Sequence, residues 1–235
     1  MILAACSTSD DNDVEEDVSL LNAVANEEVI IDNVIACAAS EQDNSIVSVY
    51  VYPRPGISNM QYFETVSADV DKNDYANYTK KEFPIIPVFN GYLVRYELRP
   101  DNEKWVIVTF EEEGSTHLSN PIRLKQQSKP TEYLQDNVTV NTNEPAMPQF
   151  EWVDGLFDDS RIYFHVVANE NNDLLSGTYT FERQFQYYNL ENVVLNITRE
   201  TPPALLPNLP YSFTMLAVSE DNWVNLFSEI PFLFE

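Results

Sequence analysis

The segment Leu205-Leu206-Pro207-Asn208-Leu209-Pro210-Tyr211-Ser212-Phe213-Thr214-Met215-Leu216-Ala217-Val218-Ser219 carries the strongest fold signal in this chain of 235 residues. Its first part is rich in proline and contains an asparagine, which favours a turn. Apolar side chains then alternate from Tyr211 onward, and a repeat of two residues is the period of a β-strand. We therefore predict a turn that leads into a strand over residues 211–218.

The same period of two recurs along the chain from about residue 28 onward. Valine, isoleucine, threonine, tyrosine and phenylalanine dominate these runs, as they do in pleated, half-buried strands. Further strands are predicted over residues 47–51, 92–98, 105–110, 162–168, 178–188 and 193–198. Turn-forming segments such as Pro53-Arg54-Pro55-Gly56 separate them. A short turn over residues 18–24 is the only helix that the pattern suggests, so the sequence predicts an all-β fold.

The segment 205–219 resembles the fibronectin type III pattern, in which a leucine and a proline turn precede a tyrosine that opens a strand ending in Ala-Val. The resemblance implies that Tyr211 is a corner residue, whose ring packs on the core while its hydroxyl bonds back to the backbone. Phe150-Glu151-Trp152 matches the early strand that places a tryptophan inward, and Ser228-Glu229-Ile230-Pro231-Phe232 matches the closing strand. A match at the level of the fold implies no catalytic residue and no specific ligand.

The first half of the chain shows a weaker form of the same ending. Trp105 to Phe110, Gly114-Ser115 and Ser119-Asn120-Pro121-Ile122 fit a penultimate strand, a hairpin loop and a final strand. Each half has about 100 residues, which is the usual size of an immunoglobulin-like sandwich. We expect two consecutive fibronectin type III-like sandwiches after a disordered acidic tether. The expected boundaries are residues 1–27 for the tether, 28–126 for the first domain, 127–131 for the linker and 132–235 for the second domain.

The N-terminus carries a lipid-attachment pattern. Leu3-Ala4-Ala5-Cys6 supplies an apolar residue three positions before a cysteine and small residues next to it, and the acidic run Ser7 to Asp13 follows. This arrangement resembles the lipobox and export tag of surface lipoproteins of the Bacteroidetes type, which implies acylation of Cys6 and a place on the outer face of the outer membrane. A basic region and an apolar stretch of about 7 to 15 residues should precede such a site. A start codon placed too late or a truncation explains their lack, and a chance Ala-Ala-Cys at a frayed terminus is the alternative.

Charge excludes one class of partner. The chain has 13 Lys and Arg against 38 Asp and Glu, a formal net charge of −25, so it repels the phosphate backbone of nucleic acids. No basic residue precedes Arg54, and a self-repelling acidic lead of this kind suits a tether. No apolar run of about 18 residues occurs that could span a bilayer, which leaves attachment through lipid alone.

Only two cysteines are present, Cys6 and Cys37. If Cys6 is acylated, Cys37 is most simply a small buried hydrophobic residue. If it is not, the pair can form a disulfide in an oxidising compartment. Neither the cysteines nor the two histidines, His117 and His165, have the spacing of a zinc site.

A polar segment in the first half holds the candidate ligand-binding residues. Asp69, Asp71 and Asn73 place oxygen ligands at alternate positions, as a calcium loop would, although the turn glycine and the terminal glutamate of an EF-hand are missing. A solvated acidic loop is the other interpretation. Tyr75 and Tyr78 follow in a run where no strand period turns them inward, so we expect them to be exposed and able to contact a ligand.

No catalytic motif stands out. Asp154, Asp158, Asp159 and Glu151 offer carboxylates, but the sequence does not fix the separation that a glycosidase pair needs. No nucleophile-elbow motif surrounds Ser160, which lies five residues before His165. The leading hypothesis is a non-enzymatic, lipid-anchored surface protein that binds a ligand, similar in layout to accessory lipoproteins that capture polysaccharide for an outer-membrane transporter. The alternatives are a structural or adhesion subunit of a surface assembly without a sugar ligand and, with little support, a hydrolase.

Overall fold

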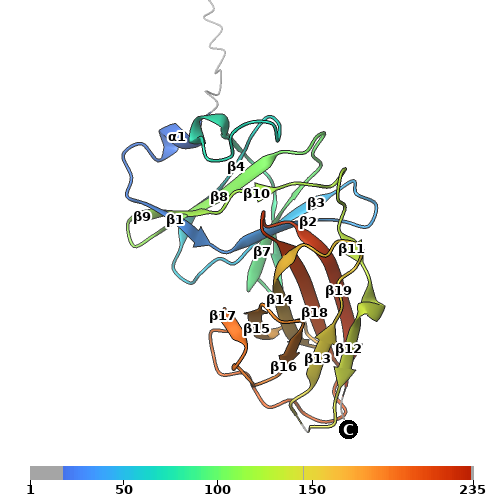
Figure 1. Cartoon of the computed structure of the whole chain (residues 1–235). Helices are drawn as coiled ribbons and strands as arrows, with labels where there is room; N and C mark the ends of the chain where they lie inside the picture. Colours follow the sequence, from blue (N-terminus) through green and yellow to red (C-terminus); the bar gives the residue numbers. More distant parts are fainter. Residues whose placement is uncertain (1–17, 145, 234–235) are drawn as a thin grey trace, which may run out of the picture.

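The computed structural model describes residues 18–144 and 146–233. It consists of two β-sandwiches that follow one another along the chain, the first blue to green and the second yellow to red in Figure 1. The described helices are short: α1 (Leu20–Ala23) and the 3-10 turns η1 (Tyr75–Asn77) and η2 (Gln135–Asn137). The fold is therefore all-β, as the sequence predicts.

The first sandwich is built from two sheets. One sheet runs in the order β1 (Val29–Val34), β9 (Ser115–Ser119), β8 (Trp105–Glu112), β4 (Ser58–Glu64) and β5 (Thr79–Lys81), and β10 (Ile122–Arg123) also pairs with β8. The other runs in the order β2 (Ala36–Ser40), β3 (Val47–Val51), β7 (Leu93–Leu98) and β6 (Ile85–Val88). Val49, Tyr62, Tyr96, Val108 and Phe110 are buried between the sheets. Alternate residues of each strand supply this core, because successive side chains of a strand point to opposite faces.

The second sandwich has a small sheet and a large one. The small sheet runs β12 (Val138–Asn141), β13 (Gln149–Trp152) and β16 (Gln184–Gln186). The large sheet runs β11 (Glu132–Tyr133), β19 (Val224–Phe232), β18 (Tyr211–Ser219), β14 (Ser160–Asn169), β15 (Leu174–Thr180) and β17 (Val193–Asn196). Phe150 stacks on Phe213 across the two sheets, with ring centroids 3.9 Å apart. This division of consecutive strands between two facing sheets is that of an immunoglobulin-like sandwich.

The two residues expected to mark this sandwich lie where the sequence places them. The hydroxyl oxygen of Tyr211 accepts a hydrogen bond from the backbone N–H of Leu206 over 2.8 Å, and the ring is buried. Trp152 on β13 is buried in the same core. The tyrosine corner is confirmed, and it fixes the turn that leads into β18.

The two central strands of the large sheet are buried on both faces. Tyr163 on β14 and Phe213 on β18 point to the small sheet, within the core of the second sandwich. Phe164 and its cross-strand partner Leu216 point the other way and belong to a cluster that includes Tyr52 and other residues of the first sandwich. The two sandwiches therefore share apolar contacts across their junction.

Two expectations about local structure are wrong. Within residues 18–27, assigned to the disordered tether, α1 lies against the first sandwich: Leu20 is fully buried, and its backbone N–H donates to the carbonyl of Tyr78 over 2.9 Å. The run 178–188 is two strands rather than one, because the chain leaves the large sheet after Thr180 and enters the small sheet at Gln184. The hydroxyl of Thr180 donates to the carbonyl of Glu182 over 2.7 Å and holds this bend.

Candidate functional site

Tyr78 is not part of an exposed surface, which corrects the expectation from sequence. Its side chain has no solvent exposure and packs in a cluster with Leu20, Phe63 and Ile107. Its hydroxyl donates to the carbonyl of Lys72 over 2.7 Å, so the ring anchors the polar loop to the sandwich. Burial raises the pKa of this tyrosine. Only Tyr75 of the predicted pair remains partly accessible, at the edge of the same cluster.

The acidic loop is closed by hydrogen bonds of its own. A carboxylate oxygen of Asp71 accepts the backbone N–H of Asn73 over 2.9 Å, and the Asp71 carbonyl accepts the side-chain amide of Asn77 over 3.1 Å. Asp69, Asp71 and Asn73 lie on this exposed turn. Among residues 18–144 and 146–233, no three His, Cys, Asp or Glu side chains come together in a group that could hold a metal ion.

Cys6, the predicted lipidation site, lies outside the described residues. The part of the chain that the structure describes contains no helix with the length and apolar character needed to cross a membrane. Cys37 lies on β2 at the junction of the sandwiches, where burial raises the pKa of its thiol to about 12.

The carboxylates near residue 155 hold the second sandwich together. Asp154 accepts the hydroxyl of Tyr163 over 2.9 Å and forms an ion pair with Arg183. Asp159 forms an ion pair with Lys129 and accepts the side-chain amide of Asn225 over 2.7 Å. Both carboxylates thus have structural partners in this state of the molecule.

The tip of the β18–β19 hairpin joins the two sandwiches. Trp223, at this tip, is fully buried among the core residues of the first sandwich. The carbonyl of Asn222 accepts the backbone N–H of Ala38 over 2.9 Å, and Asp221 forms an ion pair of 2.6 Å with Lys125. These contacts fix the orientation of the second sandwich against the first.

Arg199 makes a second connection at the junction. Its guanidinium lies 4.2 Å from the ring centroid of Tyr92 and 5.4 Å from that of Tyr52, two stacked rings of the first sandwich. The Tyr92 hydroxyl accepts the backbone N–H of Arg199 over 2.6 Å and donates to the carbonyl of Ile197 over 2.7 Å. No local signal in the sequence links these positions, because they are about a hundred residues apart.

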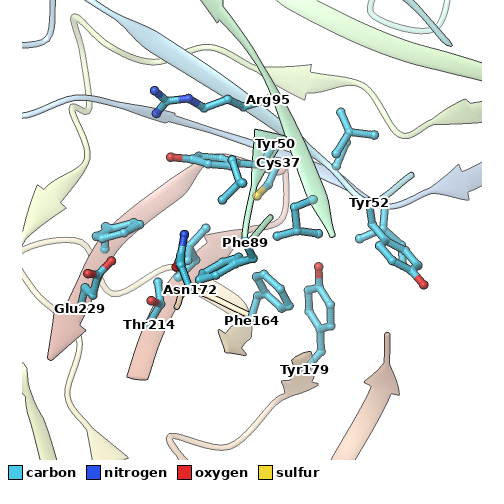
Figure 2. Close-up of a pocket in the computed structure, with 17 residues that line it drawn as sticks. Cys37, Tyr50, Tyr52, Phe89, Arg95, Phe164, Asn172, Tyr179, Thr214 and Glu229 are labelled. Carbon is cyan, nitrogen blue, oxygen red and sulfur yellow. The ribbon is translucent and has the colours of Figure 1, made fainter. Parts of the chain in front are cut away.

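A cavity of about 220 Å³ lies between the sandwiches (Figure 2). The first sandwich contributes Cys37, Tyr50, Phe89 and Arg95, and the second contributes Phe164, Tyr179, Thr214 and Glu229, among other residues. The walls are mostly apolar, with a few polar atoms. This composition is typical of sites that bind small molecules.

A separate polar depression of about 340 Å³ lies on the second sandwich, over β16 and the segment that follows it. Its lining residues are mostly amides and carboxylates: Gln149, Glu182, Gln184, Phe185, Gln186, Asn189, Glu191 and Asn192. The glutamines alternate with Phe150 and Phe185 along β13 and β16: the phenylalanines point into the core, and the glutamines point outward. These outward-pointing glutamines are the feature from which the sequence could have identified this surface.

Tyr188, the residue before Asn189, has an unusual backbone conformation. Its φ is +70°, in the left-handed region that bulky residues avoid. The neighbouring Asn189 lines the depression, the Tyr188 hydroxyl donates to the carbonyl of Pro202, and the side chain is 36% exposed. Such outliers gather at functional sites, where the surroundings hold them in place.

The fold and its tyrosine corner define the class of this protein as a tandem of two fibronectin type III-like sandwiches. No family model matches the chain, and no curated protein matches it. It is similar to the solved structure of the FN1–FN3 domains of chicken CNTN1, with 13% identity, a TM-score of 0.33 and 89% of this chain covered. The match covers 65% of that chain, so this chain spans less than two thirds of it. It is also similar to a two-domain fibronectin type III segment of chicken tenascin, with 10% identity, a TM-score of 0.31 and coverage of 87% of this chain and 98% of that chain.

Proposed function

We propose that this protein is a non-enzymatic, lipid-anchored accessory protein of the outer-membrane surface that binds a neutral polysaccharide through the second sandwich. The observation that carries the proposal is the polar depression over β16, in which Gln149, Gln184 and Gln186 converge with Asn189 and Asn192. Amide side chains both donate and accept hydrogen bonds, which suits the recognition of sugar hydroxyls.

Charge narrows the ligand class. Glu182 and Glu191 line the depression, and the chain as a whole carries a formal charge of −25. Like charges at close range cost free energy unless they are paired. Acidic polysaccharides are therefore disfavoured, and neutral glucans, mannans or xylans fit better.

The anchor and the place in the cell rest on Leu3-Ala4-Ala5-Cys6 and the acidic run after it. An acylated Cys6 followed by self-repelling residues would hold the sandwiches away from the membrane. The fixed junction between the sandwiches supports this picture, since a rigid body on a tether presents one face at a constant distance from its attachment.

Affinity electrophoresis of a soluble form against neutral and acidic polysaccharides tests the proposal. We expect retardation by at least one neutral polysaccharide and by no acidic one. Replacing Gln184 and Gln186 by alanine should weaken binding about tenfold, because each lost hydrogen bond contributes about 0.5 to 1.5 kcal/mol. Tyr75→Ala, which alters the first sandwich far from the depression, is the matched control.

A structural or adhesion role is the second candidate, and the junction favours it specifically. Trp223 and Arg199 lock the two sandwiches into one body, as a spacer or an assembly subunit requires. Retardation by none of the polysaccharides would favour this role over glycan capture. Loss of binding in Tyr75→Ala, with the glutamine variant unchanged, would instead move the sugar site to the first sandwich.

A further inference from the structure

Two side chains that line the cavity between the sandwiches each have a buried polar atom without a protein partner. Within the described residues, neither Oγ1 of Thr214 nor Nε of Arg95 makes a hydrogen bond. Thr214 is only 3% exposed and comes from β18, whereas Arg95 comes from β7 of the first sandwich. Figure 2 shows Thr214 on the side of the second sandwich and Arg95 on the side of the first, above the ring of Tyr50. A buried polar atom without a partner is unfavourable, so such atoms point to a group that the cavity takes up.

The apolar walls set the size of that group. Phe89, Phe164 and Tyr179 contribute rings. Leu216 contributes an aliphatic side chain from the same face of β18 as Thr214. An apolar cavity of about 150 Å³ in another protein holds benzene, so 220 Å³ accommodates one ring and a short substituent. The cavity is too small for a sugar chain.

The charged groups near the cavity indicate which ligand charge it disfavours. The Arg95 guanidinium is already shared between two carboxylates, with Glu97 at 3.1 Å and Glu41 at 3.8 Å. Glu229 adds a further carboxylate to the lining, opposite Thr214 on the neighbouring strand. Arg199 adds a second guanidinium, which stacks on the lining residue Tyr52. Two positive groups thus face three carboxylates in and around the cavity, and this net negative charge disfavours an anionic ligand.

We propose that the cavity between the sandwiches binds a small uncharged molecule, made of one aromatic ring or a short aliphatic chain with a single hydroxyl or carbonyl group that pairs with Thr214. The ring would lie among Phe89, Phe164 and Leu216. This site is independent of the polar depression, because it lies at the junction and requires no sugar. Its ligand class is a small amphipathic molecule rather than a polymer.

Fluorine NMR of the intact protein with three matched probes tests the proposal. The probes are 4-fluorobenzyl alcohol, 4-fluorotoluene and 4-fluorobenzoate, which share one ring and differ in the polar group. We expect the alcohol to bind and the benzoate to bind at least tenfold more weakly. Thr214→Val should lower the affinity for the alcohol about fivefold, which is the factor for one hydrogen bond. Its affinity for 4-fluorotoluene should stay within twofold of that of the parent protein.

Three further variants separate loss of the site from loss of the fold. Leu216→Trp should fill the cavity and abolish binding of all three probes, and Cys37→Leu serves the same purpose if the tryptophan variant does not fold. Thr139→Val, on an exposed position of β12, is the matched control and should change nothing. Sharp, unshifted lines for every probe would overturn the proposal, as would equal affinity for benzoate and alcohol or an unchanged affinity of Thr214→Val for the alcohol.

Discussion

The indole N–H of Trp223 donates to the carbonyl oxygen of Lys129 over 2.7 Å, while the ring is buried in the core of the first sandwich. Lys129 lies in the segment that joins the sandwiches, and Trp223 lies at a hairpin tip of the second one. The Trp223 side chain, from the second sandwich, thus fills part of the core of the first. The two sandwiches should therefore unfold together.

Trp223→Ala tests this coupling. Removing a buried tryptophan leaves a cavity and costs about 3 to 5 kcal/mol, and here the loss falls on the first sandwich and on the junction. We expect one calorimetric transition for the parent protein and two separated transitions for the variant. Phe181→Ala is the control, because its side chain is 65% exposed. Two separated transitions in the parent would contradict the coupling.

Tyr211→Phe removes the hydroxyl that closes the turn before β18. The backbone N–H of Leu206 then loses its acceptor, and we expect the free energy of unfolding to fall by about 1 to 3 kcal/mol. Chemical denaturation measures the loss. Tyr188→Phe, at a more exposed ring, is a matched control and should cost less. Equal losses in the two variants would mean that the corner hydrogen bond contributes little.

His165 gives the stability a defined dependence on pH. Burial lowers its pKa to about 3, whereas the unfolded value is about 6.5. Between these values the unfolded chain binds a proton that the folded chain does not, so stability is lost as the pH falls below about 6.5. The parent should lose about 2 kcal/mol more than His165→Leu between pH 7 and pH 5. Denaturation curves at both pH values decide this, and parallel losses in the two proteins would refute it.

Arg199→Ala should loosen the junction without changing either core. Arg199 is itself exposed and stacks on Tyr92 and Tyr52 from the solvent side, and a cation–π interaction at an exposed site contributes about 0.5 to 1 kcal/mol. Arg199→Lys keeps the charge but loses the planar stacking, so it should restore only part of the loss. Urea denaturation compares both with Arg161→Ala, an exposed arginine on β14. If Arg161→Ala lowers the free energy of unfolding as much as Arg199→Ala does, the Arg199 contact is not specific.

Cys6→Ser tests the anchor in a protein expressed with a full signal peptide. The parent should partition into detergent and the variant should remain in the aqueous phase, because the acyl chain on Cys6 would provide the attachment. The melting temperature should not change. Continued membrane association of the variant would rule out a lipid anchor at this residue.

Local patterns determined the fold class. The alternation after Tyr211, the turn before it and the inward Trp152 each depend on residues close together in the chain, and each is where the sequence placed it. Net charge likewise follows from composition alone. These features are readable because the strand period and turn chemistry are properties of neighbouring residues.

The candidate sites depend on tertiary contacts. Tyr78 sits in a polar run, yet it is buried because Leu20, from a segment expected to be a free tether, packs on the first sandwich beside it. Phe164 and Leu216 point away from their own core and meet the first sandwich, which the alternation of one strand cannot reveal. The cavity beside Thr214 and the burial of Trp223 depend on pairs of residues about a hundred positions apart or more. Such contacts arise only when two complete sandwiches dock, so no local pattern encodes them.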